Sequence, residues 1–165
     1  MKRHGSYTLT CSKDSMLIKC FGSWNLETTR IYSLEYKAVA APLINRSWAV
    51  VCDMRNWELA TPESMTVFQG LMNWCFDMGM KSCIYVYEDS FIKRHYLREM
   101  ADRIKNEIPE DYNFIHMTDT SHAYDWLKSH DHEVILSDLL ELDAATEDFN
   151  NQKQAGFGKS PQFIR

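Results

Sequence analysis

Apolar and polar residues follow five strand-like patterns along the chain. Residues 6–12 alternate between the two kinds, which is typical of a half-buried strand, and residues 16–21 return as a second strand after a short polar turn. These two segments predict a β-hairpin. Residues 48–53 and 83–87 are almost continuously apolar, as in strands that helices cover on both faces, and residues 113–117 make a shorter strand.

Helical spacing of apolar residues predicts four helices between and after these strands. Asn25 is a suitable N-cap for the first, Thr61-Pro62-Glu63 has the order of an N-cap, a proline and an acid, and Ser90 opens the third. The expected inward-facing stripes are Ile31, Leu34, Ala38 and Ala41; Met65, Phe68, Met72, Cys75 and Met78; Leu97, Met100, Ala101, Ile104 and Ile108; and Ala123, Trp126 and Leu127.

The order of these elements, β-β-α-β-α-β-α-β-α, predicts the fold class. Strands that alternate with helices indicate an α/β fold with right-handed crossovers and a mixed, mainly parallel five-stranded sheet with about four helices. The opening hairpin adds the antiparallel strand. We expect this α/β domain to span residues 5–130.

Residues 131–165 differ from the rest and are expected to form an acidic C-terminal extension. They hold 3 basic against 7 acidic residues, whereas residues 1–130 hold 15 against 16. Val134–Leu142 predicts one short amphipathic helix, and the polar sequence from Asn150 onward predicts a mobile end.

Composition excludes several classes of protein. With 45% hydrophobic residues the chain can form a core, and no apolar run reaches the roughly 18–20 residues that cross a bilayer. The domain is nearly neutral, which argues against nucleic acid as a partner. The five cysteines form no CxxC pair and favour buried thiols in a reducing, cytoplasmic environment.

Two segments resemble a known family. The Gly-x-Trp-Asn entry to the first helix, at residues 22–25, and the strand at residues 48–53 followed by Thr61-Pro62-Glu63 look like the STAS/SEC14-like branch of the anti-sigma-factor-antagonist fold. The resemblance covers about residues 5–130. It implies a STAS-like α/β domain, and it leaves the C-terminal extension uncovered.

The same resemblance implies a regulatory site. In the better-known antagonists a strand ends in Asp, and an Asp-Ser-Ser-Gly helix start follows whose serine is phosphorylated by a partner kinase. Asp53 matches the acid, but Thr61-Pro62-Glu63-Ser64 replaces the phosphoacceptor motif. Thr61 and Ser64 are the candidate phosphoacceptors, and plain helix capping is the alternative for Thr61.

The most promising surface follows the third strand. We expect Asp53 to Glu58 to form a loop beyond the carboxyl end of a parallel strand, where ligands of open α/β sheets usually bind. The alternative is a loop with Trp57 folded onto the core and Arg55 paired to a neighbour, with Trp24 packed beneath the loop and Asn25 acting only as a cap. The partner-binding candidates are Trp24, Asn25, Asp53, Arg55, Asn56 and Trp57.

No catalytic or metal-binding motif accompanies this surface. The sequence has no nucleophile elbow and no strand-linked phosphate loop, so we predict neither an enzyme nor a cofactor. His130-Asp131-His132 lacks the spacing of a zinc site, and these histidines are expected on the surface.

The sequence therefore predicts a non-enzymatic regulatory or adaptor domain that binds a protein partner through the loops at the carboxyl end of the sheet. The alternative is a small-molecule or lipid carrier, which needs an apolar cavity between the sheet and a helix layer. Its candidate lining is Met65, Met72, Met78, Met80 and Met100. The extension is expected to dock on its own domain or on a second copy in a homodimer.

Overall fold

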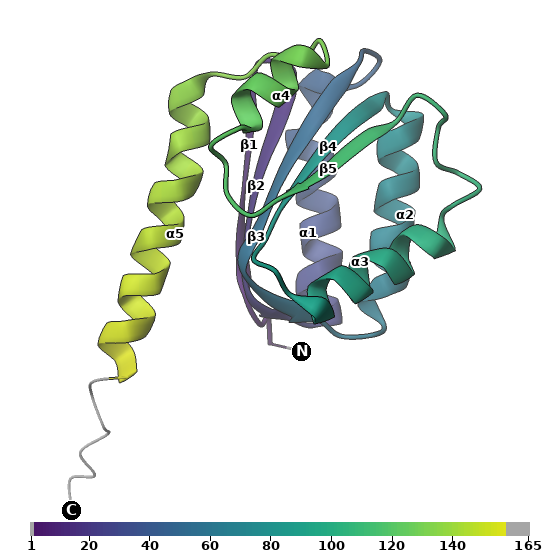
Figure 1. The fold of residues 1–165 in the computed structure, drawn as a ribbon. Helices are drawn as coiled ribbons and strands as arrows, with labels where there is room; N and C mark the ends of the chain where they lie inside the picture. The colour runs from purple at the N-terminus through teal and green to yellow at the C-terminus, as the bar shows by residue number, and fades with distance from the viewer. Residues whose placement is uncertain (1, 158–165) are drawn as a thin grey trace, which may run out of the picture.

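The computed structural model describes residues 2–157, which form a five-stranded sheet with helices on both faces (Figure 1). The strands lie across the sheet in chain order, and the first pair is antiparallel while every later pair is parallel. The predicted mixed, mainly parallel sheet is confirmed. The strands are β1 (Ser6–Ser12), β2 (Ser15–Trp24), β3 (Trp48–Ala60), β4 (Met80–Val86) and β5 (Asn113–Met117).

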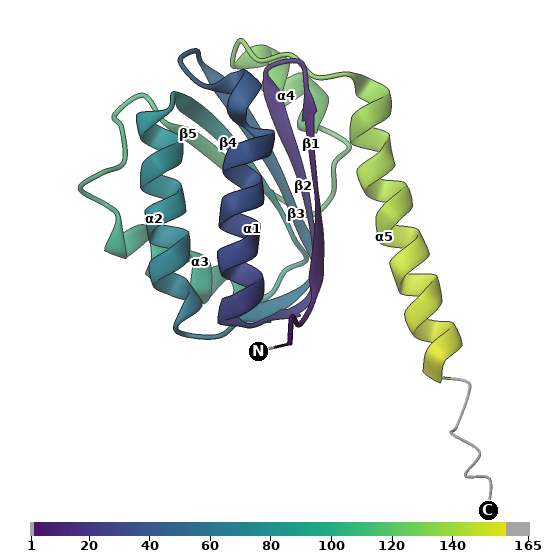
Figure 2. The ribbon, with the colours of Figure 1, turned by 180° about the vertical axis from the view of Figure 1, so that it is seen from behind.

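Three helices cover one face of the sheet and two cover the other, as the opposed views in Figures 1 and 2 show. Residues 2–157 hold five helices, which are the four predicted for the domain and the one predicted for the C-terminal extension, with a short 3-10 turn, η1 (Ala41–Leu43), after the first. None of the helices within residues 2–157 combines the length and the apolar character that crossing a membrane requires. The first face carries α1 (Leu26–Val39), α2 (Ser64–Asp77) and α3 (Phe91–Arg103), and the second carries α4 (Ala123–Ser129) and α5 (Leu136–Phe157).

The predicted inward stripe of α1 is wrong. Leu34 is 69% exposed, and Ala38 and Ala41 also lie in solvent. Polar side chains can be buried instead because they find partners: Thr29 Oγ1 donates to Ser64 Oγ at 2.9 Å. The residues that α1 buries are Thr28, Thr29, Tyr32, Ser33 and Tyr36.

The other stripes are mostly correct. Met65 and Cys75 of α2 are buried, and so are Ala123 and Leu127 of α4. α3 ends at Arg103 rather than near Pro109, and its predicted inward Ala101 is exposed. α3 is consequently a short, polar helix that rests on the core through few side chains.

The segment from Asp53 to Glu58 is part of β3 and not a loop. Two register shifts let β3 continue alongside β2 to Ala60. Between the pairs Lys19↔Asp53 and Phe21↔Asn56, β2 advances two residues while β3 advances three. Such a bulge adds one residue and changes which way the following side chains point. Asn56 therefore contacts α5, whereas Trp57 packs into the core beneath α1–α3.

The C-terminal extension also differs from its prediction. The expected short helix is 22 residues long and includes residues 150–157 of the expected mobile end; the remainder of that end, residues 158–165, lies outside the described residues. Val134, Leu139 and Leu142 are buried in the core on the second face of the sheet. The extension thus docks on its own domain in this structure.

Candidate functional site

Trp24 and Asn25 lie at the end of β2, and both have structural contacts. Trp24 is 2% exposed and its Nε1 donates to the carbonyl oxygen of Phe21 at 3.0 Å. Asn25 caps α1, since its Oδ1 accepts the backbone N–H of Thr28 at 3.0 Å. The structure thus shows the packing alternative for Trp24 and the capping alternative for Asn25, and the Trp24 side chain is not part of an exposed surface.

Asp53 lies inside β3, where its carboxylate is fully buried beside the equally buried Lys19 of β2. Lys19 Nζ donates to Asp53 Oδ2 at 2.6 Å. Arg55 donates to the same carboxylate through its backbone N–H and Nε, both at 3.0 Å from Oδ1, and through Nη2 at 2.7 Å from Oδ2. One carboxylate therefore accepts hydrogen bonds from two cations. Asp53 was expected to be open to a partner, but the structure buries it.

Helix α5 covers this group with polar side chains of its own. Asp143 accepts Arg55 Nη2 at 2.5 Å, and the hydroxyl of Thr146 contacts Lys19 Nζ. Lys19, Asp53, Arg55 and Asp143, which we call the ionic network, together carry two positive and two negative charges. The network fixes α5 to the sheet through charged hydrogen bonds, which are stronger than neutral ones.

The charges in the ionic network shift the pKa values of its members. Burial alone would raise the pKa of Asp53, but the hydrogen bonds from Arg55 and the charge of Lys19 hold that pKa below its usual value. Burial lowers the pKa of Lys19, and Asp53 opposes this only in part because it is shared with Arg55. Burial would also lower the pKa of Arg55, yet its bonds to Asp53 and Asp143 raise it.

Three of the predicted residues do line an open depression at the carboxyl end of β3. Arg55, Asn56 and Trp57 lie in its wall, and its volume is about 320 Å³. Asn56 Nδ2 donates to Asn150 Oδ1 of α5 at 2.9 Å, and Ile92 of α3, which also lines the depression, is 61% exposed. Trp57 itself is only 4% exposed, so a partner at this depression would contact mainly the other residues that line it.

The candidate phosphoacceptors lie at the start of α2. Ser64 is fully buried, and its hydroxyl accepts a hydrogen bond from Thr29. The Thr61 hydroxyl lies 3.2 Å from Ser64 Oγ, and Glu63 rather than Thr61 occupies the N-cap position without a side-chain bond. A kinase could not reach Ser64 in this conformation, and the predicted cap by Thr61 is wrong.

The histidines near the extension are not all surface residues. His132 is 2% exposed, and its Nε2 lies 2.9 Å from the hydroxyl of Ser82. Burial lowers the pKa of His132, which favours the neutral ring. Across residues 2–157, no three His, Cys, Asp or Glu side chains come together in a way that could hold a metal ion.

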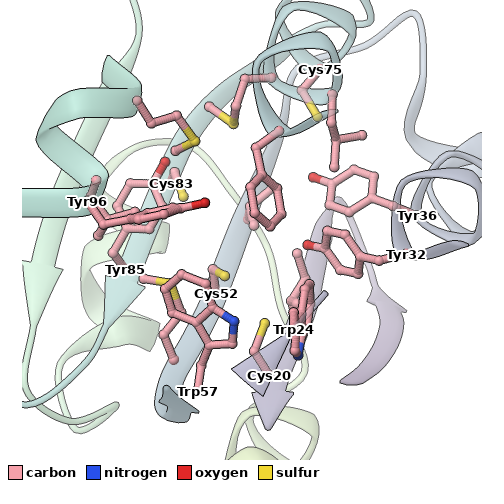
Figure 3. Close-up of a pocket in the computed structure, with 18 of the residues that line it drawn as sticks. Cys20, Trp24, Tyr32, Tyr36, Cys52, Trp57, Cys75, Cys83, Tyr85 and Tyr96 are labelled. Atoms are coloured by element: carbon pink, nitrogen blue, oxygen red, sulfur yellow. The ribbon is translucent and has the colours of Figure 1, made fainter. Parts of the chain in front are cut away.

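The opposite face of the sheet contains an apolar cavity that lies under α1–α3 (Figure 3). Its volume is about 80 Å³. Val50, Cys52, Met54 and Trp57 of β3 form its floor, because the bulge restores the inward direction at Trp57. Of the five candidate methionines, Met72, Met80 and Met100 line the cavity, while Met65 and Met78 do not.

Aromatic side chains form much of the cavity wall, and the surface that they and their neighbours expose to the cavity is almost entirely apolar. Tyr32 and Tyr36 point inward from α1, and Tyr85 and Tyr96 face them from the other side (Figure 3). The Nε1 of Trp57 and the hydroxyl of Tyr96 are buried, and neither has a hydrogen-bond partner among the described residues. Buried donors are usually paired, so these two are the features of the wall that call for an explanation.

The cavity thiols are unsuited to nucleophilic chemistry. All five cysteines are free, and Cys20, Cys52, Cys75 and Cys83 line the cavity. Burial raises the pKa of Cys75 to about 12 and raises that of Cys83 as well, so both stay protonated at neutral pH. The cavity can therefore hold a molecule, but its thiols are poor candidates to attack one.

A groove of about 350 Å³ adjoins the cavity between α3 and the β4–β5 edge of the sheet. The side chains of Met72, Tyr85, Leu97 and Met100 line both spaces. Methionine is unbranched and adapts its shape easily, so Met72 and Met100 are suited to move and join the groove to the cavity.

Comparison with known proteins concerns the fold. No family model matches the sequence, and no curated protein is similar to it in sequence. A solved structure, an uncharacterized protein from the DUF3478 family with a SpoIIAA-like fold from Shewanella loihica PV-4, matches with a TM-score of 0.53 and 15% identity over 77% of this chain and 96% of that one. The chain has a STAS-like fold. The predicted resemblance to the anti-sigma-factor-antagonist-like fold is thereby confirmed, for the fold alone.

Two parts of this STAS-like domain were missed from the sequence. Lys19 is a single charged residue inside the apolar segment of residues 16–21, a position where a cation is rarely buried unpaired. That pattern, with Asp53 in the neighbouring strand, was the available signal for the ionic network. The second part is most of the cavity lining: the carrier alternative named an apolar cavity and three of its methionines, but the other lining residues come from six different elements and share no sequence signal.

Proposed function

We propose that the STAS-like domain binds a small, mainly apolar molecule in the cavity between the sheet and α1–α3. The observation that carries this proposal is the pair of buried donors, Trp57 Nε1 and Tyr96 Oη, which have no partner among the described residues in an otherwise apolar wall. Ligand pockets typically combine apolar walls with a few such polar groups. A ligand with one hydrogen-bond acceptor would satisfy a donor that is otherwise costly to bury.

The size of the cavity limits the ligand. Its 80 Å³ is more than a single water needs and about half of the roughly 150 Å³ of an engineered cavity that binds benzene. A larger ligand requires Met72 and Met100 to move toward the groove. The fully enclosed binding of a long lipid is therefore disfavoured, and a compact molecule is favoured.

Tryptophan fluorescence tests this proposal directly, because Trp24 and Trp57 both line the cavity. Titration with cyclohexanol and with octan-1-ol, which do not fluoresce and carry one hydroxyl acceptor, should change the emission in a saturable way. The blocking variant is Cys52→Met, which fills the cavity from β3, and its matched control is Cys11→Met on β1, which lies outside the cavity.

The two variants separate ligand binding from folding. Filling 80 Å³ can stabilise the protein by up to about 2 kcal/mol, at roughly 24 cal/mol per Å³. Cys52→Met should therefore keep or raise the melting temperature while weakening both probes more than tenfold, whereas Cys11→Met should bind them like the wild type. The absence of saturable binding, or unchanged binding by Cys52→Met, would refute the proposal.

A protein partner is a second candidate function, and the depression at the carboxyl end of β3 supports it. Arg55, Asn56 and the exposed Ile92 occur there together, a mixture of charged, polar and apolar groups that protein interfaces use. Co-purification with Ile92→Asp should lose such a partner, and Leu34→Asp on the exposed side of α1 is the matched control. Equal recovery of the same partner with both variants would exclude this surface.

A further inference from the structure

The groove beside the cavity is lined by apolar and by basic side chains. Phe76 of α2, Tyr112 and Phe114 of the β5 region and Ile104 at the end of α3 form apolar walls. Phe114 is 66% exposed, which is unusual for an aromatic side chain of this size. The groove therefore continues the apolar surface of the cavity out to solvent.

Three basic side chains line the same groove. Arg94 and Arg98 are one turn apart on α3, and His116 lines the groove from β5. The His116 ring stacks on Tyr87 with 3.8 Å between ring centroids, and its Nε2 donates to the carbonyl oxygen of Tyr87 at 2.9 Å, which fixes the ring in place. None of the described residues that line the groove is Asp or Glu.

The two arginines differ in their existing contacts. Arg94 Nη2 pairs with Asp89, whose side chain is 82% exposed and does not line the groove. Arg98 makes no ion pair with any residue in the described part of the chain. A guanidinium has five donors, so both side chains retain hydrogen-bonding capacity toward a group in the groove.

We propose that the groove and cavity together take an anionic amphiphile, a compact acyl or aromatic body that carries one carboxylate at one end and, in the part that enters the cavity, one hydrogen-bond acceptor for Trp57 or Tyr96. The apolar body enters past Met72 and Met100 into the cavity, and the carboxylate remains at Arg94 and Arg98. This proposal rests on the proposed function, since it names the class of molecule that the cavity would hold. Its own support is charge complementarity: a carboxylate is a planar anion whose two oxygens match the paired donors of a guanidinium group, and two such groups lie one turn apart in this groove.

The test compares two probes with the same eight-carbon chain, octanoate and octan-1-ol, by isothermal titration calorimetry on the full chain. We expect octanoate to bind at least tenfold more tightly than octan-1-ol. Arg94→Gln and Arg98→Gln should each weaken octanoate about threefold and together about tenfold, as partly exposed ion pairs do, while leaving octan-1-ol unchanged. Arg103→Gln, on the same helix but outside the groove, is the matched control.

The possible results distinguish this proposal from the proposed function. If octan-1-ol binds as tightly as octanoate and the double variant affects neither, the cavity binds apolar molecules but the carboxylate site is refuted. If neither probe binds, both proposals fail. If Arg103→Gln weakens octanoate as much as Arg98→Gln does, the effect reflects the overall charge of α3 and the carboxylate site is again refuted.

Discussion

The ionic network implies that substituting Asp53 destabilises the protein more than substituting Lys19, although both residues are buried. Asp53→Asn removes the carboxylate that pairs with Lys19 and weakens the three hydrogen bonds that Arg55 donates to residue 53. Removing one partner of a buried ion pair typically costs about 3–5 kcal/mol, because the other charge stays buried without compensation. We expect a loss in that range for Asp53→Asn.

Lys19→Met should cost much less. The variant removes one buried cation, but Asp53 keeps its three hydrogen bonds from Arg55, and the methionine fills a similar volume. One charged hydrogen bond contributes about 1.5–3 kcal/mol, and the relief from burying an ammonium group offsets part of it. We expect a loss below about 2 kcal/mol.

Urea denaturation, followed by circular dichroism, measures both variants against the wild type. The double variant, Lys19→Met with Asp53→Asn, should lose less free energy of unfolding than the sum of the two single losses. It contains no lysine that could be left buried without a partner. Equal losses for the two single variants, or a larger loss for Lys19→Met, would refute the view that Asp53 is the shared centre of the network. A loss below about 1 kcal/mol for Asp53→Asn would do the same.

Three further predictions concern single residues. Tyr96→Phe should stabilise the protein by up to about 1 kcal/mol in urea denaturation, because its buried hydroxyl has no partner among residues 2–157; a loss of stability would mean that the hydroxyl is satisfied. His132 has a folded pKa below 6.5, so the unfolded chain takes up its proton first and stability should fall as the pH drops below that value. Melting curves from about pH 8 to 5 should show this dependence, and His132→Gln should reduce it; an unchanged slope would contradict the assignment. Gly79→Ala should lower the melting temperature by several degrees, because a Cβ there would lie 2.3 Å from the carbonyl oxygen of Arg46 at φ +100°; no change would show that this turn can relax.

The strands and their order along the chain could be predicted because each strand has a simple pattern of apolar residues. Residues 48–52 are apolar throughout since both faces of β3 are covered, and the alternation of residues 6–12 shows an edge strand with one covered face. The fold class followed from these patterns and from the crossovers they require. The resemblance to the STAS-like fold rested on the same residues.

Other features depended on contacts that a pattern does not contain. The stripe of α1 was misjudged because Thr28 and Thr29 are buried through hydrogen bonds while Leu34 is exposed. The prediction ended the third strand at Asp53 because charged and polar residues follow. In the structure Arg55 is paired with Asp143 of α5, and two bulges let β3 continue. The spacing of apolar residues shows neither the hydrogen bonds that allow threonines to be buried nor the ion pairs that allow charged residues within a strand.

The candidate site was predicted only in part for the same reason. Trp24 and Trp57 were predicted as partner-binding candidates, and the structure buries both; they lie 6.3 Å apart between ring centroids in the cavity wall. Asp53 and Arg55, grouped with them by proximity in sequence, point to the opposite face and contact α5. One residue of shift in a strand decides between the two faces, and the bulges that set it are not visible in the sequence.

Methyl NMR of the methionines tests the proposed ligand-binding function most directly. With carbon-13 in the methionine methyl groups, titration with octanoate should shift the signals of Met72 and Met100, which line both the cavity and the groove. Met16 and Met65, which are buried but line neither space, provide the internal control. Saturable shifts confined to the lining methionines are the predicted result, and equal shifts at all of them, or none at any, would contradict a ligand site in the cavity.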